Sequence, residues 1–178
     1  MSRTLQRDRT ALVVIDVQEA FRDAVGEFDA VAHNAAVLVQ GARILDVPVL
    51  VTEQYPRGLG ETVPEVAAHL DGIPRLEKVI FSAVRADGFD LDGRDQALVC
   101  GIEAHVCVAQ TVADLLDEDV DVQVAGDAVS SRTAANRRAG LAKMEASGAM
   151  LTSTEMALFE LLGRAGTPEF KQVQALVK

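Results

Sequence analysis

Short apolar segments recur along the chain and alternate with longer segments of helical periodicity. The apolar segments cover residues 11–16, 47–52, 77–81, 96–101, 121–126 and 148–153. Runs of this length, apolar at nearly every position and rich in β-branched residues, are typical of parallel strands covered on both faces. Helices are predicted between and after them, at residues 29–45, 106–116, 133–147 and 153–162, with a final helix opened by Thr-Pro-Glu at 167–169.

This alternation of strand and helix predicts one domain over residues 1–178, built on an open α/β sheet with right-handed crossovers. Such sheets bind ligands beyond the carboxyl ends of their strands. The residues expected there are Asp16, Glu53, Gln54, Tyr55, Lys78, the segment 101–107 and Asp127. The position of Lys78 is ambiguous, because the run 77–81 is short enough to place it at either end of a strand.

Composition and charge narrow the classes of partner. The net charge of −10, from 17 basic and 27 acidic residues, argues against nucleic acid or an anionic membrane as a partner. No apolar stretch approaches the roughly 20 residues of a transmembrane helix, and the first ten residues lack the apolar region of a secretory signal. Two cysteines are too few for a disulfide framework. We therefore expect a cytoplasmic protein with reduced thiols.

Cys107 lies where an apolar run gives way to a helical pattern. Free N–H groups and the helix dipole at a helix start lower the pKa of a thiol, and a lysine nearby would lower it further. Cys107 is therefore a candidate nucleophile. Free cysteines are also among the most buried residues, so position alone leaves nucleophile and core residue evenly balanced. Cys100 lies inside the apolar run and is predicted to pack in the sheet.

Polar residues near two other strand ends fit the same site. Asp16 ends an apolar strand, where a carboxylate is costly unless it is paired or functional, although a helix N-cap is the alternative role. Gln18 and Phe21 follow it as a polar neighbour and an apolar wall. Lys78 stands beside the apolar residues 79–81 and needs a partner. Asp16 is the candidate partner if their strands are neighbours; otherwise Lys78 extends along a strand edge to solvent.

Metal and nucleotide sites have no support in the sequence. The three histidines, His33, His69 and His105, are far apart, and no HxH, HxxxH or DxH cluster occurs. His105 is not expected to reach the sulfur of Cys107 from a tight turn. The glycines form neither GxGxxG nor GxxxxGK[ST], so neither a nucleotide nor any other cofactor is expected.

Asp16, Lys78 and Cys107 occur in an order and at spacings that resemble the isochorismatase-like cysteine hydrolases. VVIDVQEAF is similar to the first strand of that family with its catalytic aspartate, KVIFSAV to the lysine strand, and LVCGIEAHVCV to the nucleophile loop. TEQYPRGLGETVPE and the C-terminal segment resemble the subgroup of isochorismatase domain-containing proteins and related bacterial hydrolases. The resemblance implies a Rossmann-like three-layer sandwich with a mostly parallel sheet of about six strands, and a homo-oligomer.

The resemblance also implies a role for each residue. Cys107 would attack a carbonyl carbon, Asp16 would accept and return the proton, and Lys78 would hold both groups in their charged forms. A cis peptide bond between Ile102 and Glu103 is implied as well. The oxyanion hole would consist of the backbone N–H groups of Glu103 and Cys107.

The segment after the second strand departs from part of the family. Nicotinamidases carry an Asp-Trp-His-type metal site there, whereas this chain has Glu-Gln-Tyr-Pro at 53–56, so a metal-held pyridine ring is not expected. Gln54 and Tyr55 are instead expected to line the substrate pocket together with Gln18 and Phe21, and with Glu53 beside them. The segment 83–96 is short and contains two glycines, so the helix usual there is expected to be reduced to a loop.

The leading hypothesis is a metal-independent hydrolase that cleaves a small amide, or a related carbonyl compound, through a thioester on Cys107. Isochorismatases proper cleave a vinyl ether without needing a thiol, so the cysteine favours amide hydrolysis. One alternative is a non-catalytic oligomeric binding or scaffold member of the same fold. The other is a redox protein with a reversible Cys100–Cys107 disulfide.

Overall fold

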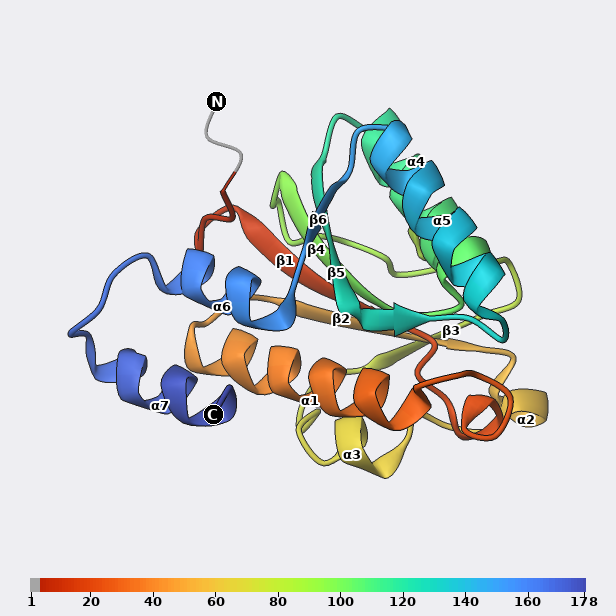
Figure 1. Cartoon of the computed structure of the whole chain (residues 1–178), viewed down its shortest axis with the longest axis horizontal. Helices are drawn as coiled ribbons and strands as arrows, with labels where there is room; N and C mark the ends of the chain where they lie inside the picture. Colours follow the sequence, from red (N-terminus) through yellow and green to blue (C-terminus); the bar gives the residue numbers. More distant parts are fainter. Residues whose placement is uncertain (1–3) are drawn as a thin grey trace.

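A computed structural model describes residues 4–178, in which six strands form one parallel sheet (Figure 1). The order across the sheet is β3-β2-β1-β4-β5-β6, and every neighbouring pair is parallel. The strands are β1 (Thr10–Ile15), β2 (Val49–Gln54), β3 (Arg75–Lys78), β4 (Gln96–Ile102), β5 (Asp121–Ser130) and β6 (Met150–Thr152). The predicted α/β fold is confirmed, with a sheet that is wholly parallel.

Helices cover both faces of the sheet (Figure 1). One layer holds α1 (Phe28–Ile44), α3 (Pro64–Ala67), α6 (Thr154–Leu162) and α7 (Pro168–Leu176), and the other holds α4 (Ala109–Asp117) and α5 (Ala134–Ala146). The remaining elements are short: α2 (Pro56–Leu59), the 3₁₀ turns Glu19–Phe21 and Ala83–Arg85, and a π-helical turn, Ala104–Val108. No helix within residues 4–178 combines the length and apolar character needed to cross a membrane.

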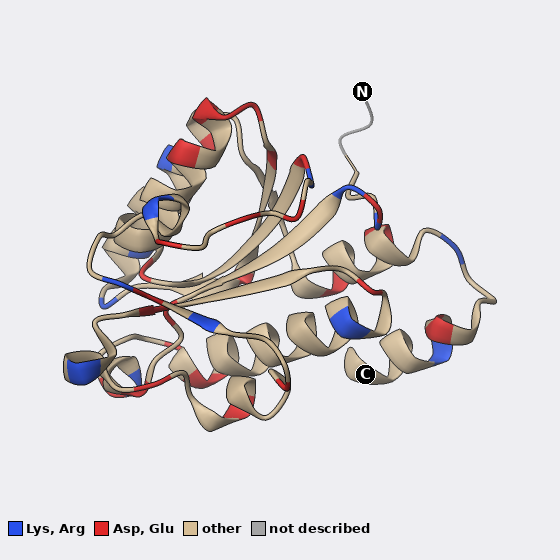
Figure 2. Ribbon diagram, turned by 180° about the vertical axis from the view of Figure 1, so that it is seen from behind, with Lys and Arg blue, Asp and Glu red and all other residues tan. Residues whose placement is uncertain are grey.

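The first strand explains why the apolar runs are uninterrupted. Leu12 and Val14 of β1 face the α1 layer, whereas Val13 and Ile15 face the α4 layer, and all four are buried. A strand covered on both faces needs apolar residues at every position. Charged residues lie mainly on the helices and loops, with both signs interspersed (Figure 2).

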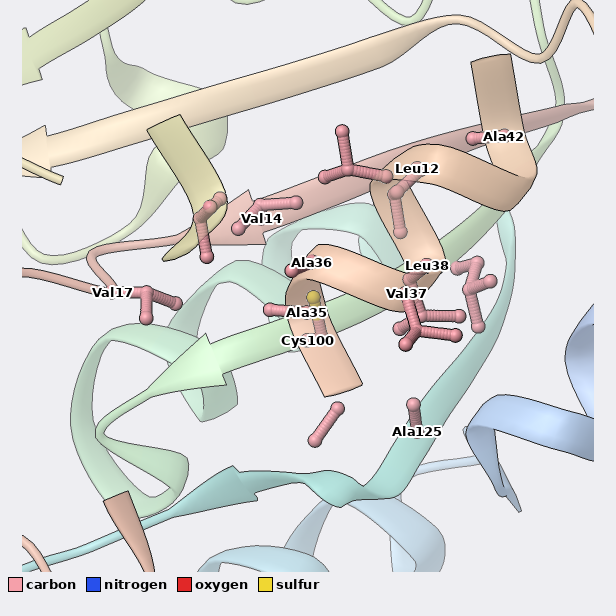
Figure 3. Close-up of a cluster of buried hydrophobic side chains, with 14 of the residues drawn as sticks. Leu12, Val14, Val17, Ala35, Ala36, Val37, Leu38, Ala42, Cys100 and Ala125 are labelled. Atoms are coloured by element: carbon pink, nitrogen blue, oxygen red, sulfur yellow. The ribbon is translucent and has the colours of Figure 1, made fainter. Parts of the chain in front are cut away.

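The two cysteines lie on opposite sides of this sheet. Cys100 of β4 belongs to the core cluster under α1, where its sulfur lies among apolar side chains such as Val14 and Ala35 (Figure 3). Cys107 belongs to the cluster under α4. Cys100 is fully buried, which confirms its predicted place in the core, and both thiols are free.

The predicted strand at 77–81 is wrong in its bounds. β3 ends at Lys78, and the next three residues, Val79, Ile80 and Phe81, are 75%, 40% and 50% exposed. β3 is an edge strand whose last residue pairs with Gln54 at the end of β2. Apolar content alone does not distinguish a buried strand from an exposed apolar loop. The shorter strand resolves the position of Lys78, which lies at the carboxyl edge of the sheet.

Two other predictions concern the segment 83–96 and Asp127. The segment 83–96 contains only one 3₁₀ turn before β4 begins, which confirms the expected loop. Asp127, by contrast, does not follow β5 but lies within it. Its carboxylate accepts hydrogen bonds from the backbone N–H and hydroxyl of Thr154, at 2.9 and 3.0 Å, so it caps the start of α6.

Candidate active site

Asp16 and Lys78 form a buried ion pair at the carboxyl edge of the sheet. Lys78 Nζ lies 2.6 Å from Asp16 Oδ2, and the two side chains are 0% and 1% exposed. The prediction made this pairing depend on neighbouring strands, but β2 lies between β1 and β3, and the two side chains meet at the edge of the sheet. Asp16 has left the strand with φ of 52°, a conformation that aspartate adopts more readily than most residues. Asp16 therefore uses its carboxylate in this ion pair and does not act as a helix cap, the alternative considered from the sequence.

Further acceptors surround the Lys78 ammonium group. Nζ donates to Gln54 Oε1 at 2.8 Å and to the carbonyl oxygen of Phe81 at 3.0 Å, with the Ile80 carbonyl at 3.4 Å. A buried ammonium requires partners of this kind for its three protons. The backbone carbonyls of the exposed apolar loop 79–81 therefore hydrogen-bond the Lys78 side chain and hold the loop against the ion pair.

The other oxygen of Asp16 is also occupied. The hydroxyl of Thr52 donates to Asp16 Oδ1 at 2.7 Å, and both residues are fully buried. Sequence analysis missed Thr52. The available signal was a hydroxyl residue at the end of the otherwise apolar run 47–52, on the strand that pairs with β1 through Ile15 and Thr52.

Cys107 lies in the π-helical turn between β4 and α4, with 7% of its surface exposed, in contact with both members of the ion pair. Burial and, to a lesser extent, the Asp16 charge raise the pKa of the thiol and Lys78 opposes them, with a net pKa of about 12. The expected lowering of this pKa is therefore wrong in sign, because burial and a neighbouring carboxylate outweigh the lysine. The resting group is a thiol whose proton needs a base.

Close backbone contacts fix the turn that carries Cys107. The Thr111 hydroxyl donates to the Cys107 carbonyl at 2.7 Å and accepts from the N–H of Ala83 at 2.9 Å. Gly140 of α5 packs against the same turn, since a Cβ added there would lie 2.7 Å from the Ala104 carbonyl. The turn is thus held between α5 and the loop that follows Lys78.

Glu103 precedes this turn, and the peptide bond between Ile102 and Glu103 is cis. The Glu103 carbonyl accepts from the N–H groups of Val106 and Val108, at 3.0 and 3.2 Å. Its carboxylate accepts from the backbone and side chain of Arg132, at 2.8 and 3.1 Å. The carboxylate of Glu103 is therefore committed to an ion pair outside the Cys107 contacts.

His105 is turned toward a neighbouring loop. Its Nδ1 lies 3.1 Å from the hydroxyl of Ser131. This agrees with the expectation that His105 does not serve the Cys107 sulfur. Within residues 4–178, no group of three or more His, Cys, Asp and Glu side chains is arranged to hold a metal ion.

The four predicted pocket residues separate into two pairs. Gln54 touches Lys78, and Tyr55, 54% exposed, lines a surface hollow of about 370 Å³ beside Lys78 and Val79. Phe21 instead packs against the core cluster under α1.

Gln18 is fully buried, and its side chain links the backbone of two segments, at Gln54 and Gly60. Its amide accepts from the Gln54 N–H at 2.7 Å and donates to the carbonyls of Gly60 and Gln54, at 2.7 and 3.0 Å. Glu53 is likewise occupied, because its Oε1 accepts from the N–H and hydroxyl of Thr62, at 2.7 and 2.6 Å. These two side chains shape the loop after β2 and leave Gln54 to reach the ion pair.

Comparison with known proteins assigns the chain to a family. The isochorismatase domain model matches residues 10–156. The chain belongs to the isochorismatase family. Human isochorismatase domain-containing protein 2 is 44% identical over 172 residues, covering 95% of this chain and 83% of the human protein. The secreted isochorismatase effector Isc1 of Phytophthora sojae is 43% identical over 177 residues, covering 95% of this chain and 84% of Isc1.

Solved structures of other proteins share the architecture of this chain. A Caenorhabditis elegans protein described as MAR1 ribonuclease superimposes with a TM-score of 0.92 at 38% identity, covering 98% of this chain and 92% of that one. The YcaC gene product of Escherichia coli, described as an octameric hydrolase of unknown specificity, has a TM-score of 0.85 at 23% identity. It covers 99% of this chain and 88% of its own, and its likeness concerns the fold alone.

Proposed function

We propose that the protein is a cysteine hydrolase that cleaves a small amide, or a related carbonyl compound, through a thioester on Cys107. The observation that carries the proposal is a thiol buried against the Asp16–Lys78 ion pair. Membership of the isochorismatase family supports a hydrolase. The proposed chemistry uses side chains and backbone groups alone, without a metal or an organic cofactor.

The raised pKa of the thiol determines the order of proton movements. In the proposed first step, Cys107 Sγ bonds to the carbonyl carbon while its proton passes to the Asp16 carboxylate. Asp16 then gives this proton to the leaving nitrogen as the C–N bond breaks. Water attacks the thioester, again losing a proton to Asp16, and the thiol regains that proton as the acid leaves.

Lys78 and the backbone supply charge stabilisation in this scheme. The Lys78 ammonium, 2.6 Å from Asp16, favours the ionised carboxylate that accepts the proton. We assign the oxyanion hole to the backbone N–H groups of Glu103, which precedes the π-helical turn, and of Cys107, which lies within it. Preorganised donors of this kind are often the largest single contribution to acyl transfer.

The proposed substrate is a small molecule rather than a nucleic acid. The C. elegans relative is described as a ribonuclease, but this chain has a net charge of −10, which repels polyanions. Its basic residues are interspersed with acidic ones rather than gathered (Figure 2). We therefore expect no RNA cleavage above that of the Cys107→Ala variant.

We also propose that the chain forms a homo-oligomer through the apolar loop beside Lys78. Tyr55, Val79, Ile80 and Phe81 are all 40% exposed or more. Val79 lines two hollows, of about 370 and 460 Å³, on either side of this loop. A protruding apolar loop with hollows beside it suits an isologous contact between two copies. Light scattering of Val79→Asp should then show dissociation, and an unchanged oligomer would exclude this surface.

The test of the catalytic proposal is the capture of an acyl group on Cys107. Wild-type protein is incubated with a library of small amides, quenched in acid and mapped by mass spectrometry. We expect an acyl adduct on Cys107, turnover of the same amide, and no turnover by Cys107→Ala or Cys107→Ser. Cys100→Ala is the matched control and should retain activity. Turnover that persists in the Cys107 variants would reject the mechanism.

The same experiment separates the two alternatives. A non-catalytic scaffold would bind ligands without ever yielding an adduct or a product. A redox protein would form a reversible Cys100–Cys107 disulfide, which the placement of these thiols on opposite sides of the sheet disfavours. Cytoplasmic localisation stays a prediction, and one relative, Isc1, is named a secreted effector.

A further inference from the structure

Thr52, like Lys78, is a buried residue whose side chain hydrogen-bonds the Asp16 carboxylate. Its hydroxyl lies 2.7 Å from Oδ1, while Lys78 binds Oδ2 at 2.6 Å. β-Strand register fixes this contact, because Thr52 pairs with Ile15, the residue before Asp16. The Asp16 N–H also donates to the Thr52 carbonyl at 3.1 Å, so backbone and side chain of Thr52 hold Asp16 together.

We propose that Thr52 is a positioning residue that fixes the rotamer of the Asp16 carboxylate for transfer of the thiol proton. This inference rests on the proposed function, in which Asp16 accepts the thiol proton. An ionised carboxylate only accepts hydrogen bonds, so the Thr52 hydroxyl must donate to it. Unlike the Lys78 ammonium, a hydroxyl can also accept, so Thr52 can rotate to receive a hydrogen bond once Asp16 is protonated.

The charged and titratable groups around Asp16 define what a pH profile would report. Lys78 approaches from the end of β3 and Cys107 from the π-helical turn. Glu53, next to Thr52 in β2, is turned to Thr62 and lies 3.9 Å from Arg75. Asp16 itself contacts both the Thr52 hydroxyl and the Cys107 thiol. A change confined to that hydroxyl therefore acts on Asp16, the proposed base.

The experiment compares Thr52→Val with Thr52→Ser. Valine has nearly the shape of threonine without the hydroxyl, whereas serine keeps the hydroxyl and loses the methyl group. The readout is the rate at which iodoacetamide alkylates Cys107, followed by peptide mass spectrometry from pH 4 to pH 9. The rate should fall on the acid side, where Asp16 becomes protonated and no longer assists the thiol.

We expect the midpoint of this acid limb to move up by about one to two pH units in Thr52→Val, since a charge-assisted hydrogen bond is lost. Thr52→Ser should restore the wild-type midpoint. Thr10→Val is the matched control, because Thr10 is a fully buried hydroxyl residue at the opposite end of β1. Thr10→Val should leave the midpoint of the acid limb unchanged. If Thr52→Val does not fold, Thr52→Ala tests the same loss of hydroxyl.

The outcomes distinguish this inference from the proposed function. An acid limb that is present in wild type but unmoved in Thr52→Val would overturn the role of Thr52 alone. Equal shifts in Thr52→Ser and Thr52→Val would also overturn it, because the methyl group rather than the hydroxyl would then matter. If Asp16→Asn alkylates as fast as wild type at every pH, Asp16 is not the base and both proposals fail.

Discussion

Replacing Lys78 with methionine should destabilise the fold far more than the loss of a surface ion pair would. Both side chains of the Asp16–Lys78 pair are at most 1% exposed, so the substitution leaves a buried carboxylate without its counter-charge. Removing one partner of a buried pair costs about 3–5 kcal/mol. The Thr52 hydroxyl still donates to Asp16 at 2.7 Å in this variant, so we expect the lower end, about 3 kcal/mol.

A second substitution tests whether the cost comes from the stranded charge. Adding Asp16→Asn to Lys78→Met removes both charges, and replacing a whole buried pair is often neutral or better. The double variant should therefore be more stable than Lys78→Met alone by at least about 1 kcal/mol. Asp16→Asn by itself should also destabilise, because the ammonium then retains only neutral acceptors.

The assay is urea unfolding at pH 7, followed by far-ultraviolet circular dichroism, for wild type, both single variants and the double variant. With a slope of about 2 kcal/mol per molar urea, Lys78→Met should lower the midpoint by roughly 1.5 M. Arg85→Met is the matched control, since its pair with Asp114 spans 2.7 Å but Arg85 is 70% exposed. That control should cost less than about 1 kcal/mol. Additive losses in the double variant, or a Lys78→Met cost as small as the control, would refute the reasoning.

Two further outcomes follow from the packing and the thiols. Gly140→Ala places a Cβ 2.7 Å from the Ala104 carbonyl, so unfolding should become easier by about 1–3 kcal/mol and Cys107 alkylation should slow. Gly26→Ala, which meets no atom within 4 Å, should change neither. Burial raises the pKa of both Cys100 and Cys107 to about 12. Their contribution to stability is therefore complete below the unfolded-state pKa of about 8.5 and is lost as the pH rises toward 12. Cys100→Ala should reduce the fall in unfolding free energy between pH 9 and 11 by about 1.4 kcal/mol per pH unit, and an unchanged slope would contradict the raised pKa of Cys100.

The sheet could be predicted because its strands are covered on both faces. The six residues of β1 are all buried, which leaves an apolar run that periodicity detects. The edge strand β3 could not be predicted in this way. β3 carries only Arg-Leu-Glu-Lys, whereas the apolar residues that suggested a strand, Val79 to Phe81, form an exposed loop. An edge strand of four residues buries too few side chains to produce a recognisable apolar run in the sequence.

That Asp16, Lys78 and Cys107 lie together could be predicted, but the hydrogen bonds around them could not. Asp16, Lys78 and Cys107 stood out because a charge or thiol at the end of an apolar run needs an explanation. Gln18 gave no comparable signal for its actual contacts, which run to the backbone of Gln54 and Gly60 across a loop. Such contacts depend on the path of a loop in space, which single-residue patterns do not encode.

The direction of the Cys107 pKa shift could not be predicted from neighbouring residues in the sequence alone. A helix start and a nearby lysine both favour a thiolate, and both could be inferred from sequence. The opposing effects, burial at 7% exposure and the Asp16 charge, exist only once the chain is folded, and they prevail. Their balance keeps the proton on the sulfur of the resting thiol. In the mechanism we propose, Asp16 therefore matters most at the moment of attack, when it accepts the proton of the Cys107 thiol.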